Sequence, residues 1–310
     1  MKPSIEPGEF DSILPWEIQI EILSWVPVKT LMQFRCVCKS WKSLISDDKS
    51  FEKLHMHRSA KNKHVLHTLL KTGGPPCYDD NEDLCLVPCP VRRLVEDRSF
   101  MIDEDGCCNL KGKYYVLGSC NGLVCYRYTW GYHDHDFARR GRFRFWNPAM
   151  RLWSKKTPTL NMTDYMSYGF GYDDSRDTYK VVGILDYWFG GGKWATMVYC
   201  MGDRCLREIS SKPSFRLWIR GKWGQFAGGC LNWLAVDELN QPNQNLPYIE
   251  RQALVILSFD MRKETYRSLS LPEDTSVVNT NLSVLGNCLC LSQDSKRTHF
   301  DVWQMREYGV

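Results

Sequence analysis

The sequence predicts a mainly β chain that begins with a short helical domain. Between residues 14 and 45 the apolar residues recur with a helical period, whereas from Tyr114 onward short runs of β-branched and aromatic residues alternate with turns. Aromatic residues are also frequent, with 12 Trp, 15 Tyr and 13 Phe. Large flat side chains pack well on pleated sheets, so this composition favours strands over most of the chain.

Composition limits the partners that we expect. The 310 residues suffice for one large or two smaller domains, and their formal net charge is only +4. Nucleic-acid-binding proteins usually carry a clustered basic face, so nucleic acid is not an expected partner. The densest basic run, "RRGRFR" (139–144), is interpreted as a solvated hairpin edge rather than a phosphate site.

The start of the chain and its cysteines indicate an intracellular protein of the cytoplasm or the nucleus. The first residues, "MKPSIEPGEFDSILPW", lack the apolar core of a secretory signal. No window approaches about 18 consecutive apolar residues, so no membrane span is expected. The 14 cysteines then indicate reduced thiols rather than a disulfide framework.

The first helix is predicted over residues 15–26. Pro15 suits the first turn of a helix, Asp11 and Ser12 are candidate caps, and Pro27 should end the helix. On a helical wheel, two nearly opposite sectors are apolar. The first contains Trp16, Ile20 and Leu23, and the second contains Ile18, Ile22 and Trp25, with Leu14 leading into it.

The second apolar sector needs a cover. Further short helices are predicted over 28–36 and 38–45, and three short helices make a thin core that only one sector of the first helix can face. Burying a large apolar side chain is worth roughly 1.5–3 kcal/mol, so leaving several exposed is costly. The pattern leaves two alternatives open: the sector packs on the rest of this chain, or it docks another protein.

The segment "LPWEIQIEILSWVPVKTLMQFRCVCKSWKSLISDDKSF" (14–51) resembles an F-box. The matching motifs are Leu14-Pro15, Glu21-Ile22-Leu23, and the segments 27–31, 34–41 and 44–47. The resemblance implies that a Skp-type adaptor covers the second apolar sector. The residues that it assigns to the adaptor face are Leu14, Pro15, Ile18, Ile22, Leu31, Val37 and Trp41.

Helical signals fade after about residue 60. The segment "FEKLHMHRSAKNK" (51–63) continues as a helix, and "KTGGPPCYDDNEDLC" (71–85) is interpreted as a loop or linker because Gly, Pro and Asp are frequent in it. We therefore expect a helical domain over 10–52, a helix and linker region over 53–105, and a β domain over 106–310.

Strands are predicted first in "YYVLGSCNGLVCYRY" (114–128), as two runs around Asn121-Gly122, a pair that tolerates the positive φ of a tight turn. Further strand-like runs cover 143–148, 179–185, 195–201, 231–236, 253–260, 282–292 and 299–305.

A repeat is visible among these runs. A strand ends in an aromatic residue, a polar turn follows, and a second large side chain returns seven residues later, which predicts a cross-strand pair. The pairs are Trp146 with Trp153, Tyr199 with Leu206, and Phe259 with Tyr266. With Trp303 the units recur at roughly 45–60 residues, close to the spacing of kelch-type propeller blades, so a β-propeller-like domain is predicted.

This region resembles the F-box-associated domain of plant F-box proteins of the F-box/kelch-repeat kind. The matching segments are "GSCNGLVC" (118–125), "WNPAMRLW" (146–153), "GFGYDDSRDTYKVV" (169–182), "VYCM" (198–201), "FDMRKETYRSLSLP" (259–272) and "DVWQMREYGV" (301–310). In the family, further blade sequence follows the last of these. The chain stops at Val310, so the resemblance implies a domain that is incomplete at its C-terminus.

No motif of catalysis or metal binding stands out. The cysteine spacings do not match paired zinc ligands, and "YHDHD" (132–136) is interpreted as a solvated loop. The segment "FGGGK" (189–193) lacks the Gly-Lys-Ser/Thr ending of a phosphate loop, and no Gly-x-Ser-x-Gly elbow occurs. We therefore expect no catalytic residue, no metal and no cofactor.

The resemblance implies a substrate receptor of a Skp–cullin–F-box ubiquitin ligase. The F-box would dock the adaptor, and through it a cullin, while the β domain holds an unidentified protein target. A truncated decoy that binds adaptor but no target, and a propeller enzyme, are the alternatives. Target recognition is expected on loops, and three candidate loops (130–142, 187–193 and 237–250) supply Trp130, His133, His135, Arg139, Trp188 and Asn243.

Overall fold

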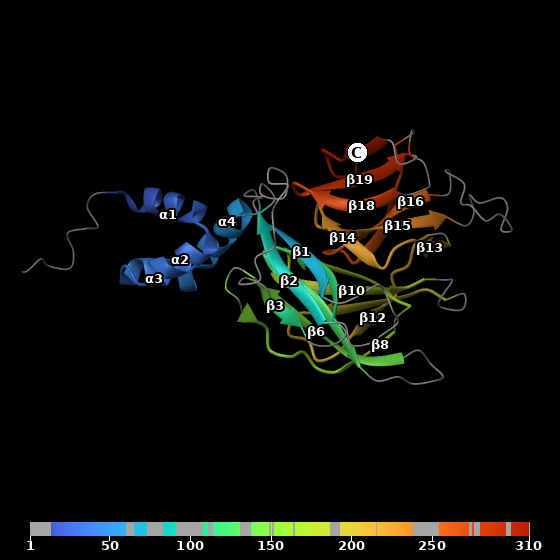
Figure 1. The fold of residues 1–310 in the computed structure, drawn as a ribbon, viewed down its shortest axis with the longest axis horizontal. Helices are drawn as coiled ribbons and strands as arrows, with labels where there is room; N and C mark the ends of the chain where they lie inside the picture. Colours follow the sequence, from blue (N-terminus) through green and yellow to red (C-terminus); the bar gives the residue numbers. More distant parts are fainter. Residues whose placement is uncertain are drawn as a thin grey trace, which may run out of the picture. The chain divides into compact units, whose positions relative to one another are not determined.

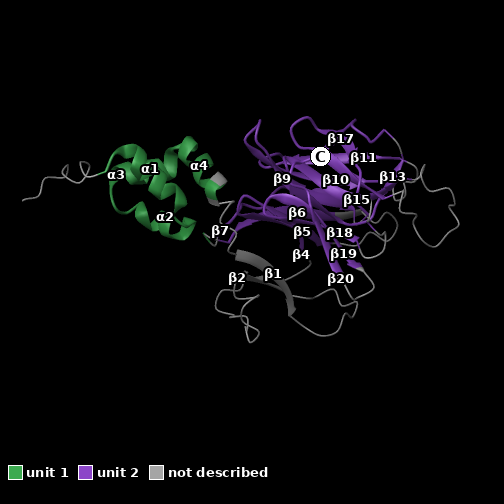
Figure 2. Ribbon diagram, turned by 90° about the horizontal axis from the view of Figure 1, so that it is seen from above, with its two compact units in different colours: residues 1–66, 89–100, 149–151 green, residues 67–88, 101–148, 152–310 purple. Residues whose placement is uncertain are grey.

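The computed structural model of this chain describes residues 14–59, 65–72, 83–90, 108–110, 114–130, 138–148, 150, 152–163, 165–186, 193–214, 216–237, 254–272, 275, 280–295 and 299–309. The chain divides into two compact units (Figure 2). The first contains the N-terminal helices and the second contains nearly all of the strands, and each is described by itself.

The N-terminal unit contains four short helices (Figure 1): α1 (Trp16–Trp25), α2 (Val28–Phe34), α3 (Lys39–Asp47) and α4 (Lys49–Ser59). The first three lie within two residues of their predicted bounds. The fourth begins earlier than the helix predicted from residue 51. The candidate caps Asp11 and Ser12 lie outside the described residues, and Pro15, in an extended conformation, immediately precedes α1.

Local sequence sets the ends of these helices. Val26, between α1 and Pro27, is extended at φ −71° and ψ 135°, as a residue before proline prefers. The Cys38 thiol accepts a hydrogen bond from the backbone N–H of Trp41 at the start of α3. The Asp48 carboxylate accepts bonds from the backbone N–H groups of Ser50 (2.8 Å) and Phe51 (2.9 Å), which would otherwise lack partners at the start of α4.

The core of the helical unit is small, as predicted. One buried apolar residue comes from each helix: Leu23, Leu31, Leu44 and Phe51. Two polar contacts add to it. The indole N–H of Trp41 donates to Gln19 Oε1 (2.8 Å), and His55 Nε2 lies 2.8 Å from the carbonyl oxygen of Val26.

The second unit repeats one pattern, an antiparallel meander of four strands in chain order. The first meander contains β4 (Tyr114–Cys120), β5 (Leu123–Trp130), β6 (Ala138–Asn147) and β7 (Leu152–Trp153). The second contains β9 (Ser167–Asp173), β10 (Thr178–Leu185), β11 (Ala195–Cys200) and β12 (Arg207–Ile209). The third contains β14 (Trp223–Ala227), β15 (Cys230–Asp237), β16 (Leu254–Asp260) and β17 (Thr265–Leu269).

Two further sheets have three strands each among the described residues. One contains β18 (Thr280–Leu285), β19 (Cys288–Ser295) and β20 (His299–Gln304), and the other contains β1 (Val65–Thr72), β2 (Asp83–Pro90) and β3 (Cys108–Leu110). The short strands β8 (Leu160–Thr163) and β13 (Leu217–Ile219) pair with β6 and β15. The bounds of the linker predicted over 71–85 were wrong, because β1 continues to Thr72 and β2 begins at Asp83.

The repeated aromatic pairs are confirmed as cross-strand neighbours in two of three cases. Trp146 lies opposite Trp153, and Phe259 opposite Tyr266, with ring centroids 5.8 Å and 4.9 Å apart. In the third case, pairing of β11 with β12 begins one residue short of Tyr199 and Leu206, although both side chains pack in one cluster. The sequence repeat therefore marks the last hairpin of each four-stranded meander.

The first strands of successive meanders lie together. β4 contacts β9 and β14, and β14 pairs in parallel with β9 at Trp223–Tyr168 and Gly224–Gly169. Sheets that meet along their first strands are the arrangement of propeller blades. The chain is thus mainly β, with N-terminal helices followed by a propeller-like domain.

Glycines permit this close approach of the first strands. A Cβ built on Gly171 in β9 would lie 2.3 Å from the ring of Phe226 in β14. A Cβ on Gly224 would lie 2.5 Å from the indole of Trp233 in β15. The aromatic rings therefore occupy the space that a side chain would need. This explains the two glycines, Gly169 and Gly171, of the segment "GFGYD" (169–173).

We predict that Gly171→Ala lowers the free energy of unfolding by about 1–3 kcal/mol, because the new methyl group displaces the packed ring of Phe226. Denaturant titration of the purified chain measures the change. Gly221→Ala is the matched control, since a Cβ there has no atom within 4 Å. Equal stability of the two variants would contradict this account of the packing.

Candidate functional site

An apolar stripe runs along the outside of α1. Leu14, Ile18, Ile22 and Trp25 recur at helical spacing and are 45%, 45%, 51% and 47% exposed. Leu23, on the opposite side of the same helix, is 1% exposed. One side of α1 thus faces the core while the other presents half-exposed side chains, a pattern typical of interaction surfaces.

Polar contacts with α4 fix the C-terminal end of this stripe. Arg58 pairs with Glu21 (Nη2 to Oε2, 2.7 Å) and donates to the hydroxyl of Ser24. Its guanidinium lies 5.0 Å from the ring centre of Trp25, whose N–H donates to Glu21 Oε1 (3.2 Å). The hydrogen bonds from Arg58 and Trp25 lower the pKa of the Glu21 carboxyl. The contacts hold the Trp25 ring in place.

The seven residues predicted for the adaptor face divide between surface and core. Leu14, Pro15, Ile18, Ile22 and Val37 are exposed, Val37 most of all at 62%. Leu31 is 5% exposed and belongs to the helical core, so the structure does not place its side chain on the exposed face. Trp41 is partly buried, with its ring centre 5.6 Å from that of Phe34.

Two exposed tryptophans of α1, Trp16 and Trp25, are absent from the predicted adaptor face. The helical wheel placed Trp16 in the core-facing sector, but its side chain is 38% exposed. Trp25 was recognised in the second sector but not named among the adaptor-face residues. Its position three residues after Ile22, in a stripe that begins at Leu14, was the signal that could have included it.

Few of the residues predicted to contact a target lie in the described part of the chain. Trp130 ends β5 and is partly buried, and Arg139 lies in β6. His133, His135, Trp188 and Asn243 lie outside the described residues.

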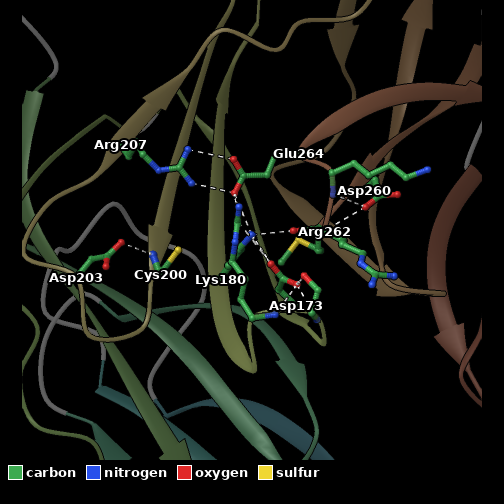
Figure 3. Close-up of polar contacts among 12 residues, drawn as sticks. Asp173, Lys180, Cys200, Asp203, Arg207, Asp260, Arg262 and Glu264 are labelled. Atoms are coloured by element: carbon green, nitrogen blue, oxygen red, sulfur yellow. Dashed lines mark hydrogen bonds and ion pairs between the residues drawn. The ribbon is translucent and has the colours of Figure 1, made fainter.

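A buried cluster of charges joins the second meander to the third (Figure 3). The ammonium of Lys180 in β10 is fully buried, 2.6 Å from Asp173 Oδ2 in β9 and 2.9 Å from Glu264 Oε1 in the turn between β16 and β17. It also donates to the carbonyl oxygen of Met261 (2.8 Å). Arg207 of β12 binds both oxygens of Glu264, at 2.8 Å and 3.0 Å.

The pKa values of the two carboxyls follow from these contacts. Burial alone would raise the pKa of Asp173, but hydrogen bonds from Lys180 and Ser175 lower it to about 2. Burial likewise opposes ionisation of Glu264, but Arg207 and Lys180 lower the pKa of that carboxyl to about 2. Because Lys180 is fully buried, a substrate could not reach its ammonium. We interpret the cluster as a link between the second and third meanders.

Sequence reasoning missed this cluster, although a second repeat marks it. "DDSRDTYK" (173–180) and "DMRKETYR" (260–267) share an initial Asp and a final Thr-Tyr-basic triplet. In both turns the Asp carboxylate accepts backbone N–H bonds two and three residues on. Asp177 and Glu264, at equivalent positions, both adopt positive φ, at 51° and 56°.

No three His, Cys, Asp or Glu side chains among the described residues are grouped so that they could hold a metal ion, and the "YHDHD" segment lies outside this part of the chain. Within the same residues, no helix is long and apolar enough to cross a membrane.

Both parts of the chain match family models. A family model of the F-box domain matches residues 12–53, and one of the F-box associated beta propeller domain matches residues 91–309. The class is therefore a helical F-box followed by a propeller-like domain. The chain belongs to the F-box proteins that carry an F-box associated β-propeller domain.

Individual relatives have the same character. An F-box/kelch-repeat protein of Arabidopsis thaliana is 30% identical over 304 residues, which cover 96% of this chain and 76% of that protein. The F-box protein CPR1 of the same plant is 25% identical over 328 residues, covering 96% and 70%. A solved structure, titled "Structure of YjhT", matches 73% of this chain and 72% of that chain at 8% identity and a TM-score of 0.36.

We predict that acid weakens the β domain through the charge cluster. Both carboxyls have a pKa lower in the folded than in the unfolded chain, so their contribution is full above about pH 5 and is lost as the pH falls toward 2. Asp173 alone contributes roughly 2 kcal/mol at neutral pH. Urea titrations of the purified chain between pH 7 and pH 3 should show this decline.

Asp173→Asn tests the assignment. The variant should be less stable at pH 7 and should lose stability less steeply on acidification, because one of the two titrating groups is gone. Asp174→Asn is the matched control, since the neighbouring Asp174 is exposed. An unchanged acid profile in Asp173→Asn would show that other groups cause the decline.

Proposed function

We propose that this protein is the substrate-recognition subunit of a Skp–cullin–F-box ubiquitin ligase. The F-box docks a Skp-type adaptor and, through it, a cullin, while the β domain holds a protein target. The contribution is positional: the target's effective concentration at the ubiquitin-carrying partner rises, without a reaction at this chain's own residues. We further propose that the protein acts inside the cell, in the cytoplasm or the nucleus.

The exposed apolar stripe of α1 is the observation that supports this proposal most strongly. Fully burying one large apolar side chain is worth roughly 1.5–3 kcal/mol. Four side chains that are each about half exposed therefore offer several kcal/mol to a partner that covers them. An amphipathic helix that lays its apolar side in a groove of another protein is a recurrent mode of recognition.

The structure refines which F-box residues we propose for the interface. Leu14, Pro15, Ile18, Ile22 and Val37 remain in the proposed contact set because their side chains are exposed. Trp16 and Trp25 join it for the same reason.

Two residues predicted for the adaptor face, Leu31 and Trp41, support α1 instead. Leu31 packs in the core beneath α1, and Trp41 hydrogen-bonds Gln19 of α1. Both therefore position the helix that carries the stripe.

We predict that an Ile18→Asp, Ile22→Asp double variant binds a Skp-type adaptor at least about a hundredfold more weakly than the native chain. Each substitution would place a carboxylate in the apolar interface, where burying an unpaired charge is costly. Co-purification followed by titration calorimetry measures the change, and the thermal unfolding midpoint shows whether the variant remains folded.

Leu285→Asp is the matched control, because Leu285 is an equally exposed apolar residue of the β domain, at 63%. It should bind the adaptor as the native chain does. Failure of the folded native chain to bind the adaptor would refute the proposed function, and equal weakening by Leu285→Asp would refute the proposed interface.

A further inference from the structure

The central strand β6 carries a column of arginines on one side of its sheet. Every second residue over 140–144 is an arginine (Arg140, Arg142 and Arg144). Their side chains therefore lie on the same face, at intervals of about 6–7 Å. The interpretation of this run as a solvated hairpin edge was wrong. β5 pairs along one side of β6, and β7 and β8 along the other.

The stretch of the β6 edge that lies between its partners β7 and β8 is also hydrogen-bonded. There the chain follows β6 through Ser154 and Thr157, whose hydroxyls accept hydrogen bonds from the backbone N–H groups of Phe145 and Phe143, both at 3.0 Å. The edge of β6 is therefore occupied. On the arginine face, Tyr126 and Trp146 beside Arg144 are buried, so the part available to a ligand is the three arginine side chains, with Arg140 at the exposed end.

Two of the three arginines lie over tryptophan rings. The guanidinium of Arg142 lies 4.7 Å from the ring centre of Trp130, and that of Arg144 lies 4.5 Å from the ring centre of Trp153. Arg142 also donates to the hydroxyl of Thr159 (3.3 Å). These contacts restrict each guanidinium, which reduces the entropy lost when its N–H groups bind a ligand. Both side chains are partly exposed, and Arg140 is exposed.

These guanidinium groups lack the carboxylate partners that three other arginines have. Arg58 pairs with Glu21, and both Arg176 and Arg207 pair with Glu264. For Arg140, Arg142 and Arg144, no carboxylate partner exists among the described residues.

The terminal Nη groups are the donors that a ligand can reach, because the Nε atoms of Arg142 and Arg144 are buried while both side chains are partly exposed. A carboxylate or phosphate oxygen that accepts from these Nη groups would form charge-assisted hydrogen bonds.

We propose that this face of β6 binds an extended acidic segment of the target protein, whose carboxylate or phosphate groups at alternating positions pair with Arg140, Arg142 and Arg144. The period of two in such a segment matches the period of two along β6. The proposal rests on the proposed function, in which the β domain holds a protein target, and it specifies the chemistry of the segment that is recognised.

An acidic peptide fits this face better than a single-stranded nucleic acid does. Nucleic-acid strands bind through bases that stack on free aromatic faces. Here Trp130 and Trp153 are each covered on one face by a guanidinium. The net charge of only +4 also gives little general attraction for a polyanion.

Fluorescence anisotropy with the full-length chain tests the proposal. Three labelled peptides share one sequence and carry glutamate, phosphoserine or uncharged glutamine at alternating positions. The glutamate and phosphoserine peptides distinguish carboxylate from phosphate recognition, and at least one of them should bind while the glutamine peptide does not. Arg142→Gln and Arg144→Gln should each weaken binding about tenfold or more, the usual value of a charge-assisted hydrogen bond.

Two further variants separate a built site from general charge attraction. Arg142→Lys keeps the charge but loses the planar fork stacked on Trp130, so it should also weaken binding. Arg262→Gln removes an exposed arginine of the turn between β16 and β17, and it should bind as the native chain does. The thermal unfolding midpoint of each variant shows that it is folded.

Three results would overturn the proposal: binding of the glutamine peptide as tight as that of the acidic peptides, native binding by the folded Arg142→Gln variant, or tighter binding of a single-stranded oligonucleotide of equal charge. Adaptor binding is measured on the same protein. A chain that binds adaptor but no acidic peptide refutes the arginine site alone, and a chain that binds the peptide but no adaptor refutes the proposed function alone.

Discussion

A buried positive charge constrains how the blades of the β domain fit together. The Lys180 ammonium has no access to water, so its charge is acceptable only if other charged and polar groups converge on it. Asp173 comes from the same hairpin, but Glu264 and the carbonyl oxygen of Met261 come from the next meander. The alignment of one blade on the next is therefore fixed by hydrogen-bond geometry as well as by apolar packing, which tolerates small shifts.

The two surfaces that we propose to be functional have a common physical basis, because each lacks something that a folded protein normally supplies. The α1 stripe lacks apolar cover, since a four-helix unit with one buried apolar side chain from each helix cannot enclose both sides of a helix. The arginine face of β6 lacks carboxylate partners among the residues that the structure describes. The charge cluster around Lys180 is the opposite case, because the ammonium lies within 3 Å of two carboxylates and has no access to water, and for that reason we assign it no ligand.

The sequence predicted what depends on local pattern. Proline positions fixed the helix bounds, and an aromatic residue repeated after seven positions predicted the cross-strand pairs of Trp146 and Phe259. Contacts between distant segments were not predictable: Lys180 and Glu264 are 84 positions apart. β9 was not predicted, because its glycines weaken the strand signal in the sequence. In the structure, the rings of Phe226 and Trp233 fill the space beside these glycines. Burial also required the structure, as the buried Leu31 and the exposed Trp16 show.

The chain-order meanders also bear on how the protein folds. Within each of the three four-stranded meanders, every strand pairs with its neighbour in sequence, so most contacts of a meander have low contact order and can form quickly. During synthesis, a meander can therefore take shape soon after its last strand leaves the ribosome. The ion pair between Lys180 and Glu264 closes a much longer loop, and it can form only after the third meander is present. Newly made chains would thus hold folded but undocked sheets for a time, and this is the stage at which chaperones would be needed most.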